Sequence, residues 1–249
     1  MKNQSENKVY TLAEVLGKHT IAELKQMTQV LEVKVLSKAK KQEIIDALSA
    51  KLLDKELLTA WLLAAGKQEI EELELAMAED VVIAEESGRF YYWRNLPVVF
   101  VTGDGVVVVP SETAAVYNEI KSDSEYAQKR SRINVFDEYL MSCVNLYRAI
   151  DITTFLSIVN GQTGMNAKRP ELESWLKDRE AVRGQQMYFF EGGYILSEEY
   201  RTKKEGEVVD YHQLLERQGA MSYYIPAKSE LLRYADSYYV CLLYTSDAA

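Results

Sequence analysis

The sequence has few of the residues from which metal sites, disulfide frameworks and catalytic centres are usually built. Its 249 residues include only two cysteines, Cys143 and Cys241, and two histidines, His19 and His212. These four residues match no familiar zinc-ligand spacing, and two cysteines make no disulfide framework. We therefore expect no metal and no cofactor.

Long apolar runs and nucleotide-binding motifs are also missing. No run approaches the ~18 apolar residues that a membrane-spanning helix needs. The N-terminus MKNQSENK is polar and lacks the apolar core of a signal peptide. The phosphate-binding loop GxxxxGK[ST] of P-loop ATPases is absent. We expect a cytoplasmic protein without a membrane contact.

No pairing of a nucleophile with a base stands out. A nucleophile needs a base within hydrogen-bond reach. Cys143 belongs to an apolar helical stripe, so we expect an ordinary core thiol. His19 is expected in a solvated loop. His212 lies near Glu216 and is either a general base or, more commonly, a partly packed surface histidine. We predict that the chain is not an enzyme.

Charge is distributed unevenly along the chain, whose formal net charge is −9. Residues 1–53 hold nine Lys or Arg against six Asp or Glu, whereas residues 54–123 hold five against fourteen. A negative total argues against a surface that binds nucleic acid everywhere. The net basic N-terminal segment is the part that could do so.

The stretch from Thr20 to Leu48 has the pattern of two short helices joined by a linker. Thr20 and Glu23 are spaced as a capping box. Apolar residues then recur at helical spacing, first in one helix and then in the other. They are Ile21, Leu24, Met27, Val30 and Leu31, followed by Ile44, Ile45 and Leu48.

The linker is rich in lysine, and it runs directly into the second helix. Backbone donors and the macrodipole at a helix N-terminus favour an anion. We predict phosphate contacts here; the alternative is that the lysines only keep a linker soluble. The residues are Lys34, Lys38, Lys40 and Lys41.

Two pieces of this stretch, TIAELK at 20–25 and LSKAKKQEIIDAL at 36–48, resemble the SAP-like helical module at the N-terminus of the transcription termination factor Rho. The resemblance covers about residues 10–52. It implies a bacterial, nucleic-acid-associated protein linked to transcription. The family usually has a glycine at the end of the first helix, where this chain has Glu32. A side chain in a left-handed cap is costly, so this turn is where we expect a departure.

The rest of the chain predicts helices interrupted by two β-hairpins. Asp54 and Asp151 are placed to cap helices. Two β-branched runs at 98–109 flank an Asp-Gly turn, and aromatic runs at 187–196 flank two glycines. Residues 124–150 predict one long helix, whose apolar seam forms either a core or a dimer contact.

Helices followed by a hairpin are the order of a winged helix. The order appears at 124–205 and, more loosely, at 54–123, which suggests a divergent repeat. We therefore predict a mainly α fold with short β-hairpins: a SAP-like module at 1–53, one or two winged-helix-like domains, and a C-terminal helical segment at 206–240, with a short helix at 211–218. The last nine residues, 241–249, resemble a translated sequencing adapter, so we expect the natural C-terminus to be missing.

Two functions fit these features. The first is a non-enzymatic regulator that contacts a DNA or RNA backbone weakly, with the winged helix adding further cations to the lysines of the linker. The second is a protein-interaction scaffold that uses the same folds without nucleic acid. The added cations would be Lys168, Arg169, Lys177, Arg179 and Arg183.

Overall fold

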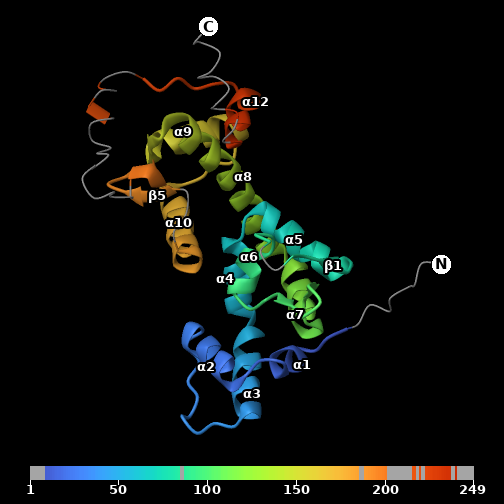
Figure 1. Cartoon of the computed structure of the whole chain (residues 1–249). Helices are drawn as coiled ribbons and strands as arrows, with labels where there is room; N and C mark the ends of the chain where they lie inside the picture. Colours follow the sequence, from blue (N-terminus) through green and yellow to red (C-terminus); the bar gives the residue numbers. More distant parts are fainter. Residues whose placement is uncertain are drawn as a thin grey trace, which may run out of the picture. The chain divides into compact units, whose positions relative to one another are not determined.

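The computed structural model describes residues 9–84, 87–184, 188–200, 215, 216, 219, 222–236 and 239. It is mainly helical with two small three-stranded antiparallel sheets, which confirms the predicted fold class (Figure 1). The chain divides into an N-terminal unit, residues 1–129, and a C-terminal unit, residues 130–249. In the described part of the chain, no helix combines the length and the apolar character needed to cross a membrane.

Several helices of the N-terminal unit begin at a residue whose side chain caps them. Thr20 Oγ1 accepts a hydrogen bond from the Glu23 N–H, and the Glu23 carboxylate accepts one from the Thr20 N–H at 2.6 Å. Asp54 caps the fourth helix as predicted. The helices are α1 (Leu12–Gly17), α2 (Ile21–Val30), α3 (Lys41–Leu52), α4 (Lys55–Ala64), α5 (Lys67–Ala78), α6 (Tyr91–Asn95) and α7 (Ser111–Lys121).

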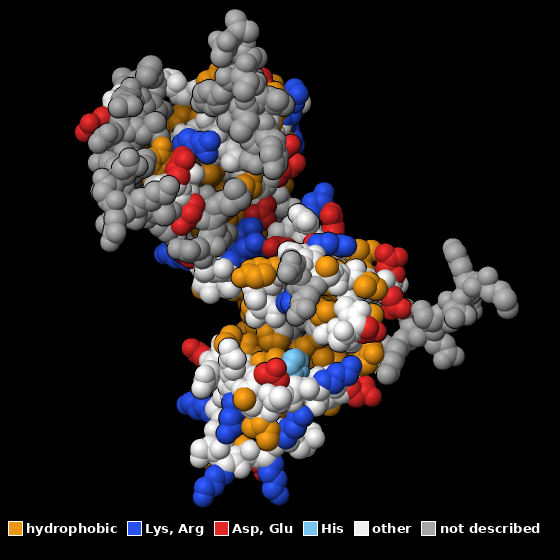
Figure 2. All heavy atoms as spheres, in the orientation of Figure 1, with side chains coloured by type: hydrophobic (Ala, Val, Ile, Leu, Met, Phe, Trp, Pro, Cys, Tyr) orange, Lys and Arg blue, Asp and Glu red, His pale blue; other side chains and the backbone are white. Residues whose placement is uncertain are grey.

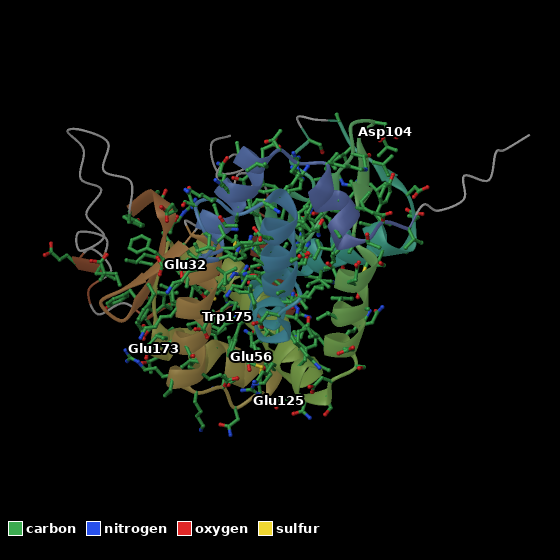
Figure 3. The ribbon with its side chains drawn as sticks, turned by 90° about the horizontal axis from the view of Figure 1, so that it is seen from below. Glu32, Glu56, Asp104, Glu125, Glu173 and Trp175 are labelled. Carbon is green, nitrogen blue, oxygen red and sulfur yellow. The ribbon has the colours of Figure 1, made fainter. Side chains whose placement is uncertain are left out.

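The sheet of the N-terminal unit contains the first predicted hairpin and one further strand. β2 (Phe100–Val101) and β3 (Val106–Val108) pair around a turn in which Gly105 has φ +81°. Figure 3 shows Asp104 at the tip of this turn. The strand order is β1-β3-β2, where β1 (Val81–Val82) was not predicted.

Residues 1–53 are not a separate compact unit. The Leu12 N–H donates to a carboxylate oxygen of Glu112 at 3.0 Å, and the Ser111 N–H donates to the Tyr10 carbonyl at 2.9 Å. These bonds attach the start of α1 to the start of α7. The predicted boundary at 53/54 therefore lies inside the N-terminal unit.

The C-terminal unit contains the second hairpin, two longer helices and all but residues 124–129 of a third. Its strands follow the order β4-β6-β5. A predicted helix at 211–218 lies largely outside the described residues, as do His212 and residues 241–249. The elements are α8 (Ser124–Tyr147), β4 (Ala149–Asp151), α9 (Ile152–Thr163), α10 (Arg169–Arg183), β5 (Tyr188–Glu191), β6 (Tyr194–Ser197), η1 (Glu198–Tyr200), α12 (Lys228–Leu231) and η2 (Leu232–Ala235).

The long helix predicted over 124–150 is three residues too long. α8 ends at Tyr147 because Arg148 adopts a left-handed conformation with φ +62°. The next three residues form β4, in which Ile150 pairs with Ile195. Asp151 then caps α9 as predicted, with its carboxylate accepting from the Thr154 N–H at 2.9 Å.

The two units share an arrangement of strands. In each sheet, the strand that comes first in the chain pairs with the third, and the third also pairs with the second. The units differ between the first strand and the hairpin, where the N-terminal unit has α6 alone and the C-terminal unit has α9 and α10. The strand order is therefore common to both units, whereas the helices between the strands are not, and the predicted repeat stays a prediction.

The apolar seam of α8 belongs to the core of the C-terminal unit. Phe136, Leu140 and Val144 are each no more than 2% exposed. The Phe136 ring lies 5.6 Å from the ring of Trp175 on α10. These side chains are covered within the chain, so this part of the seam cannot also serve as a dimer contact.

Candidate nucleic-acid interface

The linker between α2 and α3, residues 31–40, begins with a left-handed turn. The Val33 N–H donates to the Thr28 carbonyl at 2.8 Å, and the Glu32 N–H donates to the Gln29 carbonyl at 3.3 Å. Glu32 itself has φ +54°. This is the Schellman arrangement that usually contains a glycine. The expected departure is therefore wrong, since the turn is retained with glutamate at a cost of about 1 kcal/mol.

Three of the four predicted lysines point into solvent from this linker. Lys34, Lys38 and Lys40 are exposed, and their ammonium groups have no ion pair or hydrogen bond within the described part of the chain. Figure 2 shows Lys and Arg side chains gathered at the end of the N-terminal unit formed by α2, α3 and their linker. Residues 33–41 contain no acid, so these charges are not neutralised locally.

Two other lysines hold the linker in place. Lys41 is half-buried, and its ammonium group donates to the Gly17 carbonyl at 2.6 Å. Lys25 on α2 donates to the Ser37 carbonyl at 3.1 Å. Lys41 therefore ties α3 to the end of α1, and we assign it a structural role in place of the predicted phosphate contact.

The N-terminus of α3 is partly occupied by the protein itself. A Glu43 carboxylate oxygen accepts a hydrogen bond from the Lys40 N–H at 2.6 Å. A carboxylate at this position satisfies a donor of the first turn and interacts favourably with the helix dipole. The anion-binding capacity of the segment therefore rests mainly on the three exposed lysines.

The second predicted set of cations lies on or beside α10, and most of its members have partners. The Lys168 ammonium group donates to Asn166 Oδ1 at 3.0 Å. Arg169 Nε lies 2.8 Å from Glu173 Oε1, one helical turn away. Arg183 is half-buried. Lys177 is exposed, but Asp178 follows it directly.

Arg179 is not a surface residue. It is 7% exposed, forms an ion pair with Asp137 on α8, and places its guanidinium 5.1 Å from the centre of the Trp175 ring. A buried charge needs such a partner. The prediction of a phosphate contact here is wrong. The spacing from Leu172 through Trp175 to Arg179 indicates the inward face of α10, and that signal was available in the sequence.

The outward face of α10 carries both signs of charge. Figure 3 shows Glu173 on the outer side of the helix and Trp175 on its inner side. Glu171 accepts two hydrogen bonds from Arg132 on α8, one of them from Nη2 at 2.6 Å. Without Arg179, residues 168–183 hold four cations and four acids. This helix therefore presents no net positive surface to a phosphate backbone.

The described residues show no arrangement suited to catalysis by thiol or metal. Cys143 is fully buried, and burial raises the pKa of its thiol to about 12. A thiol with such a pKa is not a nucleophile at neutral pH. No cluster of three or more His, Cys, Asp or Glu able to hold a metal ion occurs within the part of the chain that the structure describes.

Comparisons of the chain with protein-family models, with curated proteins and with solved structures found no match. The resemblance of residues 10–52 to the Rho N-terminal module therefore stays a prediction. A function has to be argued from the geometry of the exposed lysines and of the surfaces around them.

Proposed function

We propose that this protein is a non-enzymatic binding protein that contacts a nucleic-acid backbone weakly through the α2–α3 linker. The observation that carries the proposal is the set of three exposed lysines, Lys34, Lys38 and Lys40, whose ammonium groups have no partner among the described residues and which lie in an acid-free stretch, residues 33–41, next to Glu32. The resemblance of the same segment to the Rho module supports a regulatory role linked to transcription.

The proposed contact is electrostatic and does not read sequence. Lysine ammonium groups contact phosphates as point charges and release counterions when they bind. Three contacts on a single strand give a slope of about −2 in a plot of log affinity against log salt concentration. The acidic remainder of the chain repels other parts of the polymer, so the complex is expected to be weak.

The proposal is tested with the full chain and labelled oligonucleotides, by fluorescence anisotropy from about 20 to about 200 mM salt. Replacing Lys34, Lys38 and Lys40 together by alanine should weaken binding to single strands at least tenfold and flatten the salt slope. The matched control replaces Lys67, Lys129 and Lys228, which removes the same charge elsewhere. Absence of binding at the lowest salt, or an equal loss in the control, contradicts the proposal.

A protein-interaction role is the second candidate. The observation that favours it is a groove of mixed apolar and polar lining beside strand β2, which belongs to the N-terminal unit but does not include the three exposed lysines.

A further inference from the structure

A groove of about 430 Å³ lies between helix α2 and strand β2 of the N-terminal unit. Its apolar lining is contributed by both elements, and Figure 2 shows hydrophobic side chains at the surface around the one described histidine, His19. Val30 is 67% exposed beside this groove, although it belongs to the apolar stripe of α2. The lining includes Met27 and Val30 of α2, the adjacent Leu31, and Val99, Phe100 and Val101 on the other side.

Strand β2 presents an unpaired edge to this groove. Among the described residues it pairs only with β3, since the strand order is β1-β3-β2. The Thr102 N–H donates to the Val106 carbonyl at 2.9 Å, and backbone groups alternate in direction along an antiparallel strand. The N–H and C=O of Val101 therefore point away from β3. They have no hydrogen-bond partner among the described residues.

The groove lining contains one arginine, Arg94, and one acid, Glu23. Arg94 lines the groove, is exposed, and has no ion pair in the described part of the chain. Glu23 keeps its negative charge, but its carboxylate accepts hydrogen bonds from Thr20 and lies 3.8 Å from His19 Nδ1. An occupant with a negative charge near Arg94 is therefore favoured over one with a positive charge.

We propose that this groove binds an extended peptide segment of a partner protein, which adds to the edge of β2 and pairs an acidic residue with Arg94. Strand addition uses backbone hydrogen bonds for affinity and pockets for alternate side chains for specificity. The N–H and C=O of Val101 can make the backbone hydrogen bonds, and the apolar residues of the lining can receive the alternate side chains. The rival occupant is the β2 edge of a second copy of this chain.

The experiment selects peptides of about twelve residues from a phage-displayed library on the full chain, and measures the affinity of the synthetic consensus peptide. The consensus should alternate apolar residues and contain one acid. Val30→Lys and Arg94→Glu should each weaken binding at least tenfold, and a peptide with lysine in place of the acid should regain affinity for Arg94→Glu. Val82→Lys is the matched control, because Val82 is also 67% exposed but lies outside the groove.

Hydrogen exchange gives a readout at the strand edge itself. Saturating peptide should slow exchange of the Val101 amide in the wild-type chain. Selected peptides without the alternating pattern, an equal loss of affinity in Val82→Lys, or unchanged exchange at Val101 overturns the proposal. A mass that doubles with concentration, and that Val30→Lys restores to monomer, assigns the groove to a second copy and also overturns it. Retained peptide binding after loss of the three linker lysines separates this site from the proposed nucleic-acid contact.

Discussion

The α2–α3 linker and helix α10 have comparable numbers of cations, but the cations differ in whether other residues of the chain pair with them. The linker and the first residue of α3 carry four lysines, of which Lys41 alone has a described partner. On α10, Arg179 is buried with Asp137 and Arg169 is paired with Glu173. The number of cations in a segment therefore does not decide whether they are available to a ligand.

The difference follows from secondary structure and from the neighbouring acids. A helix places residues four apart on the same face, so an acid at that spacing pairs with a cation within the helix. It also turns one side inward, where a charge needs a buried partner. An extended linker imposes neither constraint, and residues 33–41 hold no acid to compete.

The largest expected effect comes from the cation that is buried. Arg179→Ala leaves Asp137 without its partner in the core, so we expect it to destabilise the C-terminal unit by about 3 kcal/mol. Urea unfolding of the full chain measures this loss. Lys177→Ala on the same helix should change stability by less than about 0.5 kcal/mol. If Arg179→Ala left stability unchanged and weakened oligonucleotide binding, Arg179 would be a nucleic-acid contact and not a core residue.

The next largest effect compares the two segments directly in binding. Loss of Lys34, Lys38 and Lys40 should weaken oligonucleotide binding at least tenfold, which is about 1.4 kcal/mol. Replacing Arg169 and Lys177 by alanine should change it less than about twofold, because exposed ion pairs contribute little and the face is neutral overall. Anisotropy titrations at one low salt concentration decide between the segments. A larger loss of affinity in the α10 variant than in the linker variant would place the binding surface on α10.

A smaller effect is expected where the linker begins. Glu32→Gly should stabilise the N-terminal unit by about 1 kcal/mol, because glycine adopts the left-handed conformation without the side-chain penalty. Thermal unfolding measures the gain. Glu32→Gln removes the same charge but keeps the side chain, so it should leave stability nearly unchanged. Equal stabilisation by both variants would mean that charge, not backbone conformation, is the cause.

The smallest expected effect concerns Glu171 on α10, whose carboxylate accepts hydrogen bonds from Arg132 on α8. Hydrogen bonds from Arg132 hold the pKa of Glu171 below its usual range. A lowered pKa in the folded state contributes stability that is present above the unfolded pKa and is lost as pH falls through the folded pKa. Both side chains are 35% exposed, so screening limits the contribution to less than about 1 kcal/mol. Urea unfolding at several pH values measures this contribution to the free energy of unfolding. The contribution should be absent in Glu171→Gln and retained in Glu173→Gln.

Local features of the fold could be predicted because their causes are local. Thr20, Asp54 and Asp151 cap helices where they were expected to, and both hairpins form around glycine-containing turns. The strands β1 and β4 were missed because each is only two or three residues long and depends on a partner strand that lies further along the chain. The left-handed Arg148 carries no signal of its own, because it is not a glycine.

The candidate sites were predicted less completely than the fold. The exposure of Lys34, Lys38 and Lys40 is what a lysine-rich linker predicts, whereas the bond from Lys41 to Gly17 depends on how α1 packs against α3. The groove could not be predicted, because α2 and β2 are about seventy residues apart and meet only in the folded unit.

The hydrogen bond from Leu12 to Glu112 has a consequence for the order in which the chain folds. These two residues are 100 positions apart, so during synthesis the first turn of α1 is made long before its acceptor exists. Closing such a long loop costs entropy that only later contacts compensate. The contact between α1 and α7 can therefore form only after α7 has been synthesised, so the N-terminal segment depends in part on residues that follow it by 100 positions.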